Sequence, residues 1–212
     1  ALCALDTALH ISPYDIEGLG SKNRSKLIVL GTPAVARNGA FDVDTLFRST
    51  GCGIPMFSPI EIAFDRVLSR DGRRLMNVGV IYDPRISSDR DYQELFARAC
   101  RKHGHSGSLC FTLPSGDRDS LIFHLLDEYV DSGHGGVLDA VIIDDMYVDP
   151  DEVKNELARV VSVMNESSMT YGRLISKDFE VESSFELTAE AMYDYFRRYN
   201  LFTHNIAKPQ LQ

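Results

Sequence analysis

The stretch "LDAVIIDDMYVDP", residues 138–150, runs from an apolar segment into the start of a helix. Its first residues are apolar at nearly consecutive positions, which is typical of a strand covered on both faces. Two carboxylates, Asp144 and Asp145, follow, and Asp149 with Pro150 supplies an N-cap and a first helical residue. The stretch therefore predicts a buried strand, a turn and a new helix.

The same alternation of short apolar runs and longer helical segments occurs along the rest of the chain. The other apolar runs are "KLIVLG" (26–31), "IPMFSP" (54–59), "NVGVIYDP" (77–84), "SLCFTLP" (108–114) and "YGRLIS" (171–176). The segments between them carry apolar residues at three- and four-residue spacing, as amphipathic helices do. This alternation predicts an α/β fold with a doubly wound, mostly parallel sheet, helices on both faces and two Rossmann-like lobes.

Charge rises in "LSRDGRRLMN", residues 68–77, just before a strong strand signal, which indicates a lobe boundary. We expect a first α/β lobe over residues 1–70, incomplete because it has few strands, and a second lobe over residues 71–180. Residues 181–212 are expected to form a C-terminal helix and tail. The aromatic residues of "ELTAEAMYDYFRRYNLF" make this helix a candidate surface for a homodimer.

Composition excludes several classes of partner. With 212 residues, 44% of them hydrophobic, the chain is able to bury a sizeable core. A net charge of −9 without a long Lys/Arg run argues against binding nucleic acid or an anionic membrane. No apolar run approaches the roughly 18 residues of a membrane span. We expect a soluble protein, either cytoplasmic or exported with its signal removed. Four cysteines in no regular spacing are expected to be buried free thiols.

Candidate site residues follow from topology, because ligands of open α/β sheets bind outside the carboxyl ends of the strands. Ser58 and Ser115 lie at such ends, but no role is assigned to them. The residues predicted to contact a ligand are Thr32, Tyr82, Asp83, Arg85, Asp144, Asp145 and Lys177.

The adjacent carboxylates Asp144 and Asp145 leave three interpretations open. Both hold Mg²⁺, or both accept hydrogen bonds from an organic ligand, or Asp144 caps the following turn while Asp145 is solvated. The segment "GTPAVARNG", residues 31–39, has neither the P-loop nor the GxGxxG pattern, so we expect a plain turn there. No catalytic residue, metal site or cofactor is predicted.

Three segments together carry a family resemblance: "SKLIVLGTPAVA", "IPMFSP" and "NVGVIYDPRISSDRDYQELFARACRKHG". Their order resembles that of type I periplasmic-binding-protein-like domains, which include ABC-transporter solute receptors. The later "LDAVIIDD" is similar to the sugar-sensing domains of lactose-repressor-like regulators. This resemblance implies a hinged, non-catalytic binding or sensing domain for a sugar or amino-acid-like molecule, with Tyr82, Asp83 and Asp145 near the cleft.

The longer segment "LIVLGTPAVARNGAFDVDTLFRSTGCGIPMFSP" also resembles the second-lobe opening of aspartate/glutamate racemases. Those enzymes use two cysteines as acid and base, but the family's Cys-Asn-Thr and Gly-Cys-Thr motifs are missing here. The resemblance and the Asp pair imply an alternative, a racemase-like or Mg-dependent enzyme that uses Asp144 and Asp145. A third possibility is a structural or assembly protein that presents the aromatic C-terminal helix to a partner.

Overall fold

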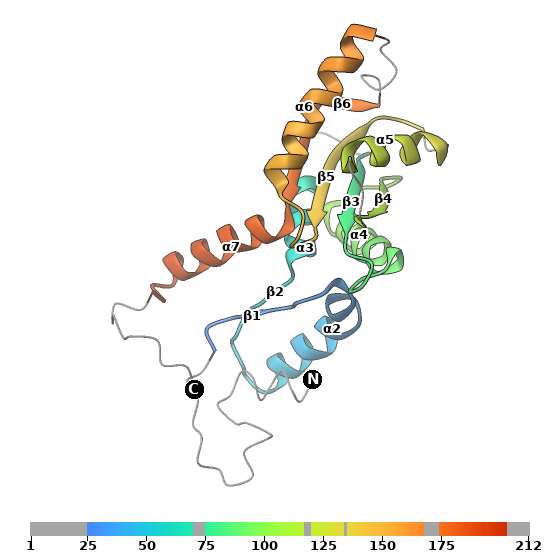
Figure 1. Cartoon of the computed structure of the whole chain (residues 1–212). Coiled ribbons are helices and arrows are strands. Elements are labelled where there is room, and N and C mark those ends of the chain that lie inside the picture. Colours follow the sequence, from blue (N-terminus) through green and yellow to red (C-terminus); the bar gives the residue numbers. More distant parts are fainter. Residues whose placement is uncertain (1–24, 70–74, 117–119, 134, 168–173, 203–212) are drawn as a thin grey trace.

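The structure, a computed structural model, describes residues 25–69, 75–116, 120–133, 135–167 and 174–202. Its main body is a four-stranded sheet with the order β4-β3-β5-β6, in which all neighbouring strands are parallel (Figure 1). The strands are β3 (Asn77–Tyr82), β4 (Leu109–Pro114), β5 (Leu138–Asp144) and β6 (Ile175–Ser183). Every residue of β5 is buried, as its continuous apolar run predicts.

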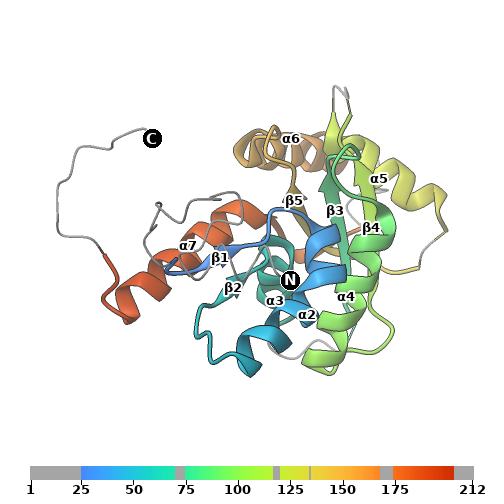
Figure 2. The ribbon, with the colours of Figure 1, turned by 90° about the horizontal axis from the view of Figure 1, so that it is seen from below.

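Helices cover both faces of this sheet, which confirms the predicted doubly wound α/β fold. Figure 2 shows α5 (Leu121–Asp131) and α6 (Pro150–Ser167) on one side, and α3 (Pro59–Leu68) and α4 (Asp89–His103) on the other. The first turns of α7 (Ser184–Arg198) pack beside α3. Two hydrophobic clusters result, because alternate residues of β3 and β5 point to opposite faces.

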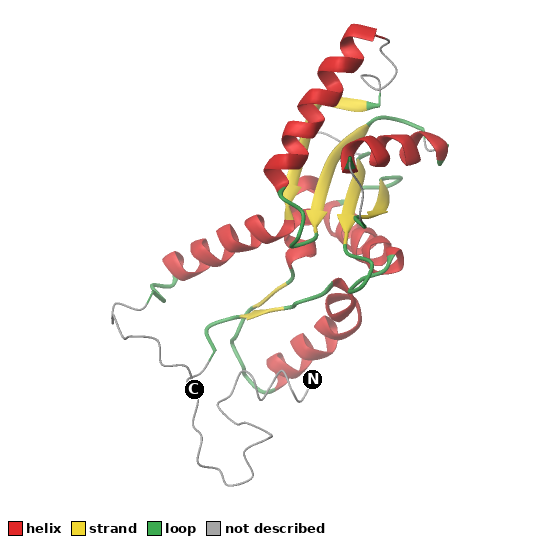
Figure 3. Ribbon diagram, in the orientation of Figure 1, coloured by secondary structure: helices red, strands yellow, loops and turns green. Residues whose placement is uncertain are grey.

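A second, smaller sheet contains β1 (Ile28–Val29) and β2 (Met56–Phe57), which are parallel, with α2 (Pro33–Ser49) connecting them. Figure 3 shows this two-stranded sheet apart from the larger one. The predicted lobe boundaries at residues 70 and 180 stay predictions. In the structure α3 packs on the core of the large sheet, and β6 runs across position 180.

Two sequence-based expectations about element bounds were wrong. Residues 33–39, expected to form a turn, are the first two turns of α2, which Thr32 caps and Pro33 begins. The strand expected at residues 171–176 is β6, which begins at Ile175 and continues to Ser183. Most of β6 alternates between exposed and more buried residues, since it is an edge strand. Such a strand lacks the continuous apolar run by which the other strands were found.

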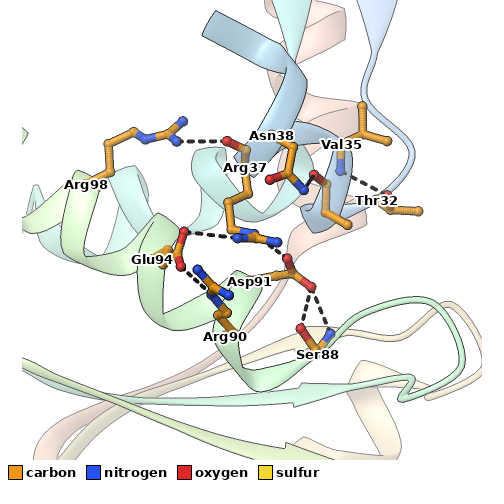
Figure 4. Close-up of polar contacts among 10 residues, drawn as sticks. Thr32, Val35, Arg37, Asn38, Ser88, Arg90, Asp91, Glu94 and Arg98 are labelled. Atoms are coloured by element: carbon orange, nitrogen blue, oxygen red, sulfur yellow. Dashed lines mark hydrogen bonds and ion pairs between the residues drawn. The ribbon is translucent and has the colours of Figure 1, made fainter.

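A polar network attaches α2 to the start of α4 (Figure 4). The Arg37 guanidinium donates to Asp91 at 2.6 Å and to Glu94 at 3.2 Å. The second oxygen of Asp91 accepts hydrogen bonds from the backbone N–H and the hydroxyl of Ser88, at 3.0 and 2.7 Å, which caps α4. One carboxylate therefore fixes both the first turn of α4 and the position of α2.

Replacing Arg37 by alanine is expected to loosen α2. Amide hydrogen exchange within α2 should become several-fold faster, while exchange in β5 stays unchanged, because α2 has few other polar anchors on the main body. The matched control is Arg48→Ala, since Arg48 makes an exposed pair with Asp44 inside the same helix. Equal acceleration of α2 in both variants would contradict this role of Arg37.

Candidate functional site

The order of the large sheet puts its topological switch point between β3 and β5. The chain leaves β3 toward β4 on one side and later enters β5 on the other side of β3. In such sheets the crevice for a ligand opens at the carboxyl ends of these strands. Tyr82 and Asp144, the last residues of the two strands, lie opposite each other in the register. The predicted residues Tyr82, Asp83, Asp144 and Asp145 therefore come together at this edge.

A cavity of about 470 Å³ opens on one side of this edge. It collects residues that follow three neighbouring strands: Asp83, Pro84, Arg85, Ser115, Gly116, Asp145, Tyr147 and Val148. Three of the seven predicted site residues, Asp83, Arg85 and Asp145, lie in it. We call it the strand-end cavity.

The floor of the cavity holds the carboxylate of Asp145. This residue is buried, with only 4% of its surface exposed. One oxygen accepts a hydrogen bond from the Ser115 hydroxyl at 2.5 Å and the other accepts one from the Tyr147 backbone N–H at 2.8 Å. These bonds fix the carboxylate in one orientation and leave further acceptor positions on its two oxygens.

The rim of the cavity is formed by Asp83, Arg85 and Tyr147. The Arg85 guanidinium donates to both oxygens of Asp83, with Nε at 2.9 and 3.0 Å and Nη2 at 2.7 Å. Hydrogen bonds from this guanidinium hold the pKa of Asp83 below its usual value. The guanidinium also lies 5.5 Å from the centroid of the Tyr147 ring, which is 76% exposed. The rim thus combines a fixed cation with an exposed aromatic face.

The neighbouring Asp144 points to the opposite side of the sheet edge, because successive side chains of a strand alternate. Its carboxylate accepts hydrogen bonds from the Tyr92 hydroxyl, at 2.9 Å, and from the Ser184 hydroxyl. Burial raises the pKa of Asp144, and the charge of Asp145 adds to this effect. Asp144 therefore ties β5 to α4 and α7, and it does not line the strand-end cavity.

The separation of the two aspartates bears on the metal interpretation. Asp144 and Asp145 face different partners, so they do not present their oxygens to a common ion. In the part of the chain that the structure describes, no group of three or more His, Cys, Asp or Glu side chains is arranged to hold a metal.

Besides Asp144, three predicted site residues lie outside the strand-end cavity. Tyr82 is buried and donates its hydroxyl to Asp89 at 2.6 Å, and burial raises its pKa. Thr32 accepts a hydrogen bond from the Val35 N–H at 3.3 Å as the N-cap of α2. Lys177 was misplaced. It is exposed near the amino end of β6, because the strand continues to Ser183, so it lies at the opposite edge of the sheet.

Sequence reasoning assigned no role to Ser115 and Tyr147, two cavity residues that contact the predicted ones. Ser115 was placed at a strand end, but its contact with Asp145 depends on the order of the strands, which the sequence does not reveal. Tyr147 was not considered, since it belongs to a turn without periodicity. The signal for it is the Asp-x-Tyr spacing, in which an aspartate side chain accepts from the backbone N–H two residues later.

The cysteines and the C-terminal helix lie elsewhere. Cys52 and Cys100 are buried free thiols, as expected, Cys110 is half-buried in β4, and Cys3 lies outside the described residues. In α7 the Tyr195 ring packs edge-on against Phe57, with centroids 5.8 Å apart. The end of this helix thus contacts β2, and a homodimer through it stays a prediction.

Comparison with known proteins gives limited similarity. No family model matches the chain, and no curated protein matches it. Among solved structures, a glutamate racemase, isoform RacE1 from Bacillus anthracis, is similar with 11% sequence identity and a TM-score of 0.48. The similarity covers 86% of this chain and 62% of the racemase, so the chain spans less than two thirds of that protein's length.

Glutamate racemases belong to the second of the two families whose resemblance was noted in the sequence. The resemblance to type I periplasmic-binding proteins stays a prediction. None of the helices in the described ranges combines the length and hydropathy that crossing a bilayer requires. Fold and cavity together define a Rossmann-like α/β protein with a polar cavity at the carboxyl ends of β3, β4 and β5.

Proposed function

We propose that the chain binds a small polar molecule in the strand-end cavity. The observation that carries this proposal is the fixed, buried carboxylate of Asp145 at the floor of a cavity of about 470 Å³. Cavities of roughly 300–1,000 Å³ with a few convergent polar groups are typical of sites for small molecules.

The charges of the cavity favour one chemistry of ligand. Asp83 and Asp145 supply two carboxylates and Arg85 one guanidinium, so the lining carries a net negative charge. Hydroxyl or ammonium groups are suited to donate to Asp145, and a planar or carboxylate group is suited to meet Arg85 and Tyr147 at the rim. A sugar or an amino-acid-like molecule satisfies both requirements.

An enzyme would convert the molecule that binds in the strand-end cavity, whereas a receptor would bind it unchanged. Cys52, Cys100 and Cys110 do not line the cavity, so among the described residues a proton transfer there would fall to a carboxylate, Asp83 or Asp145, and not to a pair of cysteines. A ligand found by binding is therefore to be tested for exchange of its carbon-bound protons in D₂O. Exchange that is lost in Asp145→Asn would favour the enzyme over the receptor.

The binding proposal predicts a selective thermal shift. In a screen of sugars, amino acids, nucleotides and divalent metals, one organic class should raise Tm, because binding only the native state adds about 2.7 kcal/mol at a concentration one hundred times Kd. Asp145→Asn keeps the shape of the residue but removes its charge. We expect it to weaken binding by about 10- to 100-fold, since hydrogen bonds to a charged group are the stronger ones.

The matched control for this test is Asp151→Asn. Asp151 is an exposed carboxylate in the first turn of α6 and does not line the cavity. The Asp151→Asn variant should bind the same ligand as tightly as the wild type does. The proposal is wrong if no ligand class shifts Tm, or if Asp145→Asn and Asp151→Asn respond as the wild type does.

A further inference from the structure

A second cavity lies away from the strand-end cavity, between α2, the β2 segment and the helices α3 and α4. It has a volume of about 480 Å³, and its walls combine apolar residues, among them Leu30, Phe41, Phe47, Ile54 and Met56, with the charged Asp44 and Arg48. It continues into a smaller cavity of about 260 Å³ that Asp65 and Lys102 line. The two cavities share Met56, Ser58, Glu61 and Arg98, so the larger cavity, which we call the chamber, opens into a smaller charged channel at these residues.

The first sign of a missing partner at this junction is Ser58. Its hydroxyl is buried, and it has no hydrogen-bond partner within the described part of the chain. Ser58 is the N-cap residue of α3, but its side chain makes no capping bond. An unsatisfied buried hydroxyl is unfavourable, so an acceptor that reached it would stabilise this region. Ser58 lines the two cavities and also a third, narrow one beside Thr32.

The second sign is the loose pairing of Arg98. Its guanidinium lies 3.4 Å from Glu61 and 3.2 Å from the Arg37 carbonyl oxygen, whose bond to Arg98 is seen in Figure 4. Charge-assisted hydrogen bonds of this kind are usually about 2.7–2.9 Å long. The other cations of the two cavities are held more closely: Arg48 by Asp44 at 2.8 Å, and Lys102 by Asp65.

We propose that this chamber is a second binding site, for a small amphiphilic carboxylate. The apolar chain of the ligand lies against Phe47, Ile54 and Met56, where burial of apolar surface stabilises it. Its carboxylate accepts hydrogen bonds from the Arg98 guanidinium and the Ser58 hydroxyl. The carboxylates near this position are Asp44, paired with Arg48, Asp65, paired with Lys102, and Glu61, which lies 3.4 Å from Arg98 and has a side chain that is 31% exposed.

Octanoate is the probe for this site, and 1-octanol is its uncharged control. In calorimetric titrations of the full chain we expect octanoate to bind with a Kd on the order of 0.1–1 mM. Arg98→Gln should weaken octanoate about tenfold and leave octanol unchanged. Arg90→Gln, a change of an exposed arginine on the same helix, should alter neither, and Asp145→Asn should also leave octanoate binding intact.

Two further measurements separate binding from folding effects. Ser58→Ala removes a hydroxyl without a partner, so Tm in the absence of ligand should stay level or rise while octanoate binding weakens. Octanoate should also slow the alkylation of Cys52, which lines the chamber, but not that of Cys110, as read by mass spectrometry. The site is refuted if octanoate does not saturate, if octanol binds as well as octanoate, or if Arg98→Gln and Ser58→Ala bind octanoate like the wild type.

Discussion

Replacing Asp144 by alanine is expected to lower the free energy of unfolding by about 2–4 kcal/mol, because the Tyr92 and Ser184 hydroxyls lose their acceptor inside the protein. Each of these groups comes from a different helix, and only 4% of the surface of Asp144 is exposed. Urea denaturation followed by circular dichroism measures the change. A loss below about 0.5 kcal/mol, which is usual for surface positions, would contradict the structural role of Asp144.

The matched variant Asp144→Asn tests the pH dependence of the same residue. Burial raises the pKa of Asp144 in the folded state above its unfolded value of about 3.9. The folded protein therefore binds this proton more tightly, and the wild type loses this part of its stability as pH rises from about 4 through the folded pKa. Asparagine does not titrate and still pairs with both hydroxyls. The stability of Asp144→Asn relative to the wild type should thus increase from pH 4 to pH 7, and a constant difference would exclude a raised pKa.

Replacing Leu125 by alanine is expected to lower the free energy of unfolding by about 2–5 kcal/mol. Leu125 is fully buried in α5 and lies over Gly79 of β3. A methyl group at Gly79 would lie 3.3 Å from Leu125 Cδ2 and 3.1 Å from Val141 Cγ2, so Gly79→Ala alone should cost about 1–3 kcal/mol through overpacking.

The double variant of these two positions provides the sharper test. The methyl group that Gly79→Ala adds fills part of the space that Leu125→Ala empties, so the combined loss should be smaller than the sum of the single losses by about 0.5–2 kcal/mol. Denaturation of all four proteins under one condition measures this coupling. Strict additivity would show that α5 does not rest directly on β3 at Gly79.

The sequence predicted the fold better than the site. Continuous apolar runs identified β3 and β5, because a strand covered on both faces needs apolar residues on both. The edge strand β6 alternates between exposed and more buried residues, so it lacks a continuous apolar run. Its carboxyl end was therefore placed too early in the sequence, and Lys177 was assigned to the wrong edge of the sheet. For residues 31–39 the absence of a phosphate-loop pattern led to the expectation of a plain turn, whereas Thr32 and Pro33 begin the helix α2, which continues to Ser49.

The composition of the strand-end cavity depends on facts that a single sequence does not contain. Asp144 is the last residue of β5 and Asp145 begins the following turn. Their side chains point to opposite sides of the sheet edge, and this can be stated only when the end of the strand is known. The contact of Ser115 with Asp145 joins residues that follow β4 and β5, two strands that are not neighbours in the sheet. The contact between Asp83 and Arg85 joins residues only two positions apart, so it can be inferred from the sequence. Both were predicted as site residues.

The double role of Asp91 implies a constraint on how this protein varies in evolution. Its carboxylate caps α4 through Ser88 and holds α2 through Arg37, so an exchange at position 91 disturbs two segments that are more than 50 residues apart in sequence. A neutral residue at position 91 that still bonds to Ser88 would keep the N-cap of α4, but it would lose the ion pair with Arg37. In related sequences, positions 37 and 91 are therefore expected to change together, whereas position 88 is expected to accept other small hydroxyl residues independently.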